Sequence, residues 1–175
     1  MYAQPQFKVV YTSGTFDLFH SNHLSLLKRA KQLCKMLIVG VNTDELVCSY
    51  KNPPTIPFEE RIAIVDALSC VDMAIPQKTL DHSETLEKIN ADCFVVGDDW
   101  YPKYDYLREN GVSVVYLPYG LGVSTSTLKK SIADDYSRLI SKTKSHENPD
   151  PRITSGKSSE FPQASVLPAT VKSMR

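Results

Sequence analysis

Short apolar runs rich in β-branched residues alternate with longer stretches of helical spacing along the first 140 residues. The runs are typical of buried strands and lie at Phe7–Thr12, Met36–Asn42, Asp72–Ile75, Cys93–Val96 and Val112–Leu117. Because strands that alternate with helices form βαβ units, we expect an α/β fold with a mostly parallel sheet of about five strands flanked by helices. Ligands of such sheets bind beyond the carboxyl ends of the strands, where the strand order reverses. The loops after the first, fourth and fifth strands are therefore where chemistry is expected.

Three stretches between these runs have apolar residues at a helical period. The spacing predicts helices whose apolar faces lie within His23–Cys34, Ile62–Ser69 and Leu128–Leu139, with Ser124 as the N-cap of the last. Beyond this helix the pattern stops: residues 141–175 contain seven serines and four prolines and have no periodicity. The sequence thus predicts a folded domain over residues 1–140 and a disordered Ser/Pro-rich tail over residues 141–175.

Charge and cysteine content narrow the class further. Twenty Lys and Arg balance 20 Asp and Glu, so no net field attracts nucleic acid or an acidic membrane surface. No apolar run approaches the ~20 residues of a membrane span, and the first residues lack the pattern of a signal peptide. The four cysteines form no CxxC pair and are typical of free thiols in a reducing compartment. We expect a cytoplasmic protein without nucleic-acid partners or membrane insertion.

The loop after the first strand, residues 13–23, carries the main candidate chemistry. His20 and His23 lie three residues apart at the start of a helix and project to the same side. The free N–H groups of a helix start attract anionic oxygens, and two imidazoles add further donors. This arrangement suits reactions at phosphate, which depend on positioning and on stabilising charge. Two alternatives remain open from spacing alone: half of a zinc site, for which no third ligand is near, and a pair of packed or capping histidines.

Four stretches together resemble the cytidylyltransferase family of the HxGH nucleotidyltransferases. The first, Gly14–His23, resembles its HxGH signature, and Lys51–Pro54 with Glu60-Arg61 resembles the K-x-P-P…E-R segment of the choline and ethanolamine branches. Gly97–Trp100 resembles the GDDW of the glycerol-3-phosphate branch, and Gly122–Ser126 the second half of the R-T-x-G-I-S-T-[ST] motif. The similarity covers roughly residues 8–138 and follows the order of the family.

The resemblance implies a Rossmann-like fold and a reaction. A small phosphomonoester, with glycerol 3-phosphate favoured, attacks the α-phosphorus of CTP, and pyrophosphate leaves with the assistance of Mg²⁺ that CTP brings; no metal site of the protein's own is expected. Members are commonly homodimers. By the same resemblance, the catalytic residues are His20, His23 and Lys51.

The resemblance also assigns binding roles. Lys51, Asp98 and Trp100 would contact the acceptor substrate. The nucleotide would be held by Thr15, Phe16, Asp17, His20, His23, Asp99, Tyr119, Gly122, Ser124, Thr125 and Ser126. Considered from the sequence alone, Ser124 is also a plain N-cap, Asp98 and Asp99 are also turn caps, and Lys51 is also a solvated lysine.

Three departures from the family pattern bear on activity. The glycine of HxGH is Asn22, which we expect to narrow the site, and the Arg-Thr that opens R-T-x-G-I-S-T is Tyr119-Gly120. Loss of a charge-assisted contact of the arginine kind costs roughly 10- to 100-fold in affinity. Where the glycerol-3-phosphate branch has substrate-binding lysines, this chain keeps only Lys51 and Lys78, and other positions are taken by Ser49, Tyr50, His82 and Ser83.

Several functions therefore fit the sequence. The first is an active cytidylyltransferase that forms a CDP-alcohol, from glycerol 3-phosphate or from phosphoethanolamine or phosphocholine. The second is a nucleotide-binding protein with weakened catalysis, which the two substituted motif positions favour. The third is a nucleotidyltransferase that uses another nucleoside triphosphate.

Overall fold

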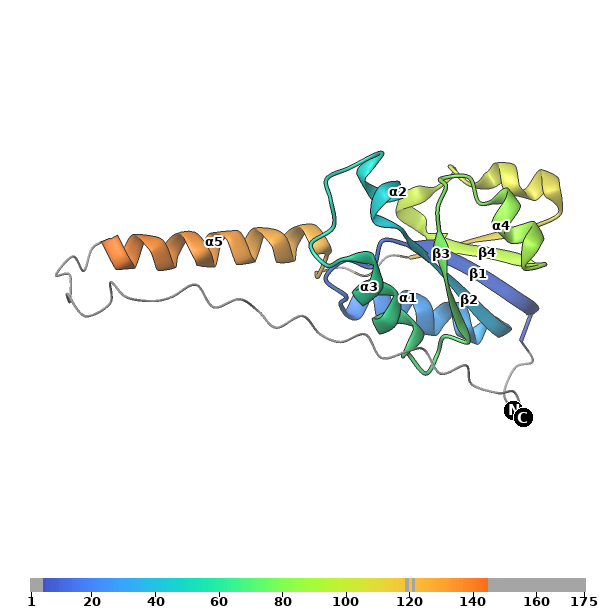
Figure 1. Cartoon of the computed structure of the whole chain (residues 1–175). Helices are drawn as coiled ribbons and strands as arrows, with labels where there is room; N and C mark the ends of the chain where they lie inside the picture. Colours follow the sequence, from blue (N-terminus) through green and yellow to red (C-terminus); the bar gives the residue numbers. More distant parts are fainter. Residues whose placement is uncertain (1–4, 119, 121, 145–175) are drawn as a thin grey trace, which may run out of the picture. The chain divides into compact units, whose positions relative to one another are not determined.

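A parallel sheet of five strands forms the centre of the computed structural model, which describes residues 5–118, 120 and 122–144. The order across the sheet is β3-β2-β1-β4-β5, and each neighbouring pair is parallel (Figure 1). The strands are β1 (Phe7–Gly14), β2 (Cys34–Asn42), β3 (Met73–Gln77), β4 (Cys93–Gly97) and β5 (Ser113–Leu117). The expected α/β class and its five strands are confirmed.

Helices connect the strands, and two of them were not predicted. The helices are α1 (Ser21–Gln32), α2 (Asp44–Cys48), α3 (Phe58–Asp66), α4 (Ser83–Lys88), α5 (Thr125–Lys144), and the 3-10 turns η1 (Asp98–Trp100) and η2 (Asp105–Asn110). The sequence analysis anticipated α1, α3 and α5. It missed α2 and α4 because five or six residues are too few to show a 3.6-residue period.

Alternate strand residues face opposite sides of the sheet and build two apolar clusters. Val10 and Val39 pack with Leu27 of α1 and Val65 of α3 on one face. On the other face, strand residues including Tyr11 and Phe94 pack against α4 and η2. The central strands β1, β2 and β4 are thus buried on both sides over much of their length, as their continuous apolar runs require, whereas the edge strands β3 and β5 are only partly buried.

The topology fixes where a ligand can bind. The chain leaves β1 for β2 and β3 on one side and then returns to β4 on the other side of β1. The strand order therefore reverses between β1 and β4, and the carboxyl ends of these two strands diverge into loops that leave a crevice.

The first compact unit of the chain ends at Asp135, within helix α5. Helix α5 begins in the first unit, where Ile132 is exposed although it was assigned to the apolar face of the helix. The helix continues to Lys144, so residues 141–144 are helical, whereas the sequence analysis placed them in a disordered tail. The remainder of that prediction, residues 145–175, lies outside the described residues. None of the helices in the described part of the chain is both long and apolar enough to cross a bilayer.

Candidate functional site

A cavity of about 530 Å³ opens at the carboxyl ends of β1 and β4. Its wall combines the loops after β1, β2, β3 and β4 with the first turns of α5. Nine of the residues expected in the site from the sequence line this one space: Thr15, Phe16, Asp17, His23, Lys51, Asp99, Trp100, Thr125 and Ser126.

Four other expected residues do not line the cavity, namely His20, Asp98, Gly122 and Ser124. The hydroxyl of Ser124 accepts a hydrogen bond from the Thr127 N–H at 3.2 Å, which makes Ser124 the N-cap that was predicted. The residues of this helix start that line the cavity are instead Thr125 and Ser126. Tyr119 lies outside the described residues.

The two motif histidines form a stacked pair with ring centroids 3.8 Å apart. His23 lines the cavity, whereas His20 lies buried and neither of its ring nitrogens has a partner among the described residues. Burial lowers the pKa of His20, and burial together with the neighbouring His20 lowers the pKa of His23 to about 4. Both shifts favour the neutral imidazole, in which His23 offers hydrogen-bonding ring nitrogens rather than a positive charge.

The loop that carries the motif has an unusual backbone. Phe16 and Leu18 have φ angles of 53° and 46°, in the left-handed region that non-glycine residues seldom adopt. Such conformations persist only where the surrounding structure holds them. The Phe16 ring, which lies edge-on to His23 at 5.4 Å between centroids, fits against Gly14, where an added Cβ would lie 3.1 Å from the ring.

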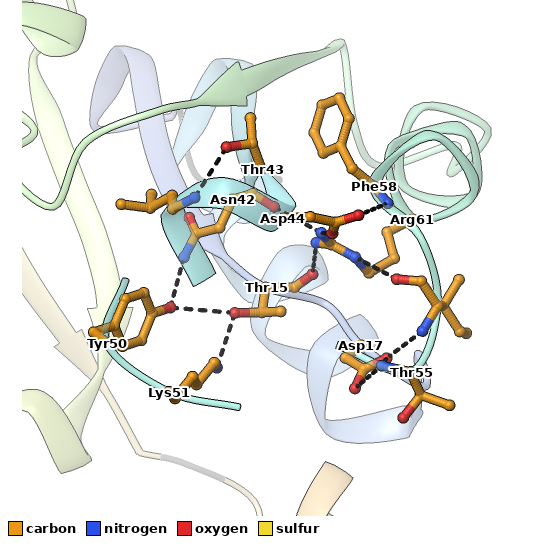
Figure 2. A network of polar contacts seen from close by, with 12 residues as sticks. Thr15, Asp17, Asn42, Thr43, Asp44, Tyr50, Lys51, Thr55, Phe58 and Arg61 are labelled. Carbon is orange, nitrogen blue, oxygen red and sulfur yellow. Dashed lines mark hydrogen bonds and ion pairs between the residues drawn. The ribbon is translucent and has the colours of Figure 1, made fainter. Parts of the chain in front are cut away.

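Arg61 holds this loop through its guanidinium group, as Figure 2 shows. Its side chain is fully buried and donates to the carbonyl oxygens of Thr15, Asn42 and Ile56 and to the Asp44 carboxylate. One guanidinium thus ties together the loops after β1 and β2 and the segment that leads into α3. The sequence placed Arg61 in the K-x-P-P…E-R segment but predicted no role for its side chain.

Asp17 is a second tie, and it holds the loops that surround the cavity. Its buried carboxylate accepts the N–H groups of Thr55 and Ile56 at 3.0 Å and pairs with Lys129 at 2.9 Å (Figure 2 shows the Thr55 contacts). Although burial opposes it, these contacts lower the pKa of the Asp17 carboxyl. Its carbonyl oxygen accepts the Thr125 hydroxyl at 2.9 Å. Asp17 therefore links the motif loop to α5, and its charge is already neutralised by Lys129.

Lys51 reaches the motif loop from the loop after β2. Its ammonium group donates to the Thr15 hydroxyl at 2.9 Å, and the Tyr50 hydroxyl lies 3.4 Å from the same oxygen (Figure 2). Asn42 donates to that Tyr50 hydroxyl at 3.1 Å. The Lys51 ammonium group and the Thr15 hydroxyl thus lie next to each other on the cavity wall, where one phosphate group could contact both.

Another part of the cavity wall is aromatic and holds a third histidine, His82. His82 is 3% exposed, packs against Phe94 and Tyr104 with centroids 4.8 Å and 5.3 Å away, and lies 3.3 Å from the Ser13 hydroxyl through Nε2. Burial lowers its pKa to about 4. Lys103 places its ammonium group 4.5 Å from the centre of the Trp100 ring, so a cation of the chain itself already lies on this aromatic surface.

Two lysines of the cavity were missed by the sequence analysis. Lys103 and Lys129 join Lys51 on the wall, against the two carboxylates Asp17 and Asp99. Burial raises the pKa of Asp99, helped by the adjacent Asp98. A signal for Lys129 existed in its position one turn into the last helix, four residues after Thr125, which places it on the same face as the expected phosphate-binding turn.

Asn22 does not narrow the cavity, contrary to expectation, because it does not line it. Its amide instead donates to the carbonyl oxygens of Gly120 at 2.8 Å and Val123 at 2.6 Å.

The described residues contain no group of three or more histidine, cysteine, aspartate or glutamate side chains that could hold a metal ion. Half of a zinc site at His20 and His23 therefore has no third ligand in this part of the chain.

Comparisons with known proteins show the family to which the chain belongs. A profile of the cytidylyltransferase-like family matches residues 11–148, and the chain belongs to this family. Among its relatives is a glycerol-3-phosphate cytidylyltransferase of Bacillus spizizenii, which is 42% identical over 127 residues, or 72% of this chain and 98% of that one. Another is the enzyme of the same name from Staphylococcus aureus, 35% identical over 71% of this chain and 95% of that one.

A solved structure supports the fold. The lipopolysaccharide core biosynthesis protein from Thermoplasma volcanium matches with a TM-score of 0.60 at 25% identity, over 65% of this chain and 98% of that one.

Proposed function

We propose that this protein is a cytidylyltransferase that transfers the cytidylyl group of CTP to glycerol 3-phosphate and releases pyrophosphate. A phosphate oxygen of the acceptor forms a bond to the α-phosphorus, and the bond from that phosphorus to the bridging oxygen of pyrophosphate breaks. One observation carries the proposal: His23, Lys51 and the first turn of α5 line the same cavity at the point where the strand order reverses. The names of the relatives supply the choice of CTP and glycerol 3-phosphate.

The chain's own residues bind and orient the reactants. Ser126 offers its hydroxyl, and Thr125 and Ser126 offer backbone N–H groups at a helix start, which suits the triphosphate. The Thr125 hydroxyl is engaged with the Asp17 carbonyl oxygen and holds this helix start at the motif loop. His23 donates one hydrogen bond from its neutral ring to an oxygen on which charge develops in the transition state. Lys51, already held at Thr15, supplies the positive charge nearest to His23.

Mg²⁺ would arrive with the nucleotide. Mg²⁺ in phosphoryl-transfer sites is held by substrate phosphates with one or two carboxylates, and it neutralises developing charge there. The cavity wall has two carboxylates for this purpose, Asp17 and Asp99. Asp17 already pairs with Lys129 and accepts two backbone N–H groups, which leaves Asp99 for the ion. We assign Asp99 as the protein group that would help to hold the ion.

We assign the aromatic part of the cavity wall, around Trp100 and Tyr104, to the acceptor and call it the acceptor wall. This wall favours a neutral polyol phosphate over a cationic one as the acceptor. A trimethylammonium or ammonium head group binds an aromatic face when no other cation lies on that face. Here Lys103 lies over Trp100 and Tyr104, and a second cation would be repelled. This contact favours glycerol 3-phosphate over phosphocholine and phosphoethanolamine.

The test is pyrophosphate release from each nucleoside triphosphate with Mg²⁺ and a panel of three acceptors. We expect release with CTP and glycerol 3-phosphate, and at least about tenfold less with phosphocholine or phosphoethanolamine. Release with ATP alone contradicts the assignment of the base. If calorimetry detects CTP binding but no acceptor gives turnover, the chain is a nucleotide-binding protein instead.

Two further expectations accompany the proposal. We propose a homodimer, which light scattering of the full chain tests directly, with a monomeric mass as the contradicting result. A cytoplasmic location also stays a prediction, which a fluorescent fusion tests.

A further inference from the structure

Two departures from the family motifs meet in space although they lie 98 residues apart. Asn22 stands at the glycine of HxGH, and Gly120 stands at the threonine of R-T-x-G-I-S-T. The Asn22 amide donates to the carbonyl oxygens of Gly120 and Val123 at 2.8 Å and 2.6 Å. Considered separately, each departure is a loss; together they occupy one small space between α1 and the segment before α5.

The space admits only one of the two side chains. A Cβ added at Gly120 would lie 2.3 Å from the Asn22 amide oxygen and 2.9 Å from its Cγ. With a residue larger than glycine at position 120, the end of the Asn22 side chain or the segment at Gly120 must shift, and either shift disturbs the hydrogen bonds of Asn22 to Gly120 and Val123. Conversely, a glycine at position 22 would leave room for a side chain at position 120.

The contacts hold the segment that leads into α5. Arg29, two turns further along α1, donates to the carbonyl oxygen of Pro118 at 2.7 Å. Side chains of α1 thus hold three carbonyl groups, those of Pro118, Gly120 and Val123. Val123 precedes the N-cap Ser124, so this anchoring fixes where the first turn of α5 places Thr125 and Ser126 on the cavity wall.

We infer that Asn22 and Gly120 are a compensated pair that positions the start of α5 for the nucleotide. Asn22 is a positioning residue and touches no reactant. In the family motifs the small residue is the glycine on α1, whereas in this chain Asn22 takes that position and the small residue is Gly120 in the facing segment. The exchange adds the two hydrogen bonds of the Asn22 amide. It therefore gives no reason to expect weakened catalysis, which was the meaning the sequence suggested for it.

A double-mutant cycle tests the pair. The variants are Asn22→Gly, Gly120→Thr and the double substitution, with Ser25→Gly as a control at an exposed position of the same helix. We expect Gly120→Thr to raise KM for CTP about tenfold in the parent, because it breaks hydrogen bonds to two carbonyl groups, but less than about twofold in the Asn22→Gly background. The kcat should change less than about twofold throughout, as it should in Ser25→Gly, since no group that acts in the transition state is altered.

The kinetic part rests on the proposed function, so urea unfolding of the same variants measures the pair without CTP. A compensated pair gives a loss of stability for Gly120→Thr that largely disappears in Asn22→Gly, whether or not the protein turns over CTP. An equal loss in both backgrounds overturns the pair. Coupled unfolding with an unchanged KM for CTP in every variant overturns the positioning role. If the parent releases no pyrophosphate, the proposed function fails, and the unfolding cycle still decides the pair.

Discussion

His23 and His82 lie on the same cavity, and burial lowers the pKa of each to about 4, yet their surroundings differ. His23 stacks on His20 beside Lys51 and the first turn of α5, in a wall rich in donors for anionic oxygens. His82 packs among Phe94, Tyr104 and Tyr11 and contacts the Ser13 hydroxyl. The difference shows that a shifted pKa does not by itself mark a catalytic group; the neighbouring groups decide what a neutral imidazole can do.

The largest expected effect separates the two histidines by turnover. His23→Ala should lower kcat at least ~100-fold, as expected for loss of a donor that acts in the transition state. His82→Gln should lower it less than about tenfold, because His82 lies among aromatic side chains on the part of the wall that we assign to the acceptor, away from the groups proposed to act on the α-phosphorus. Steady-state pyrophosphate release measures both. Near-normal turnover of His23→Ala removes the catalytic role of that histidine.

The second prediction concerns stability and pH at His82. An unfolded histidine binds a proton near pH 6.5, but the folded His82 does so only near pH 4, so acidification from pH 7 to pH 5 favours the unfolded chain. His82 alone should lower the free energy of unfolding by about 2 kcal/mol over this interval. Urea unfolding of His82→Gln at both pH values should show a drop smaller by that amount than in the parent. An equal drop in both proteins contradicts the burial of a neutral His82.

A third test concerns the cations on the His23 wall. Lys129→Gln should raise KM for CTP about tenfold, because it leaves the Asp17 carboxylate on the cavity wall without the cation that neutralises it, and this negative charge repels the triphosphate, while kcat changes little. The matched control is Lys130→Gln, the next residue along α5, which is exposed and does not line the cavity. The same KM in both variants would place Lys129 outside the nucleotide site.

The smallest effect is expected at Tyr119, where the family motif has an arginine. If Lys129 supplies the missing cation, Tyr119→Arg should improve KM for CTP less than about threefold in the parent but about tenfold in the Lys129→Gln background. Calorimetric titration with CTP gives the same comparison without turnover. A large gain in the parent would show that Lys129 is not the replacement.

The two walls also differ in how far the sequence could predict them. The β-branched runs predicted all five strands: the central ones because parallel strands buried on both faces are continuously apolar, and the partly buried edge strands β3 and β5 because they keep β-branched residues. The His23 wall followed from local motifs, in which Thr15, His23 and Thr125 stand at fixed distances from a strand end or a helix start. The roles of Arg61, Lys129 and His82 depend on contacts between segments far apart in the chain, and no local pattern encodes these contacts.

Asn22 illustrates the same limit. The sequence marked it correctly as a departure, but its expected effect was wrong, because the direction of its side chain depends on the segment before α5. The spacing also left open whether both histidines face the ligand or pack, and only the structure shows that His20 is buried and stacked on His23.

The most direct test of the account is the NMR spectrum of the histidine ring nitrogens during titration with CTP and Mg²⁺. The titration tests whether the triphosphate binds against His23 and the first turn of α5. We predict that CTP shifts the ring resonances of His23 strongly, and that those of His82 respond mainly when glycerol 3-phosphate is added afterwards. Saturation with CTP that leaves the His23 ring unperturbed would contradict the claim.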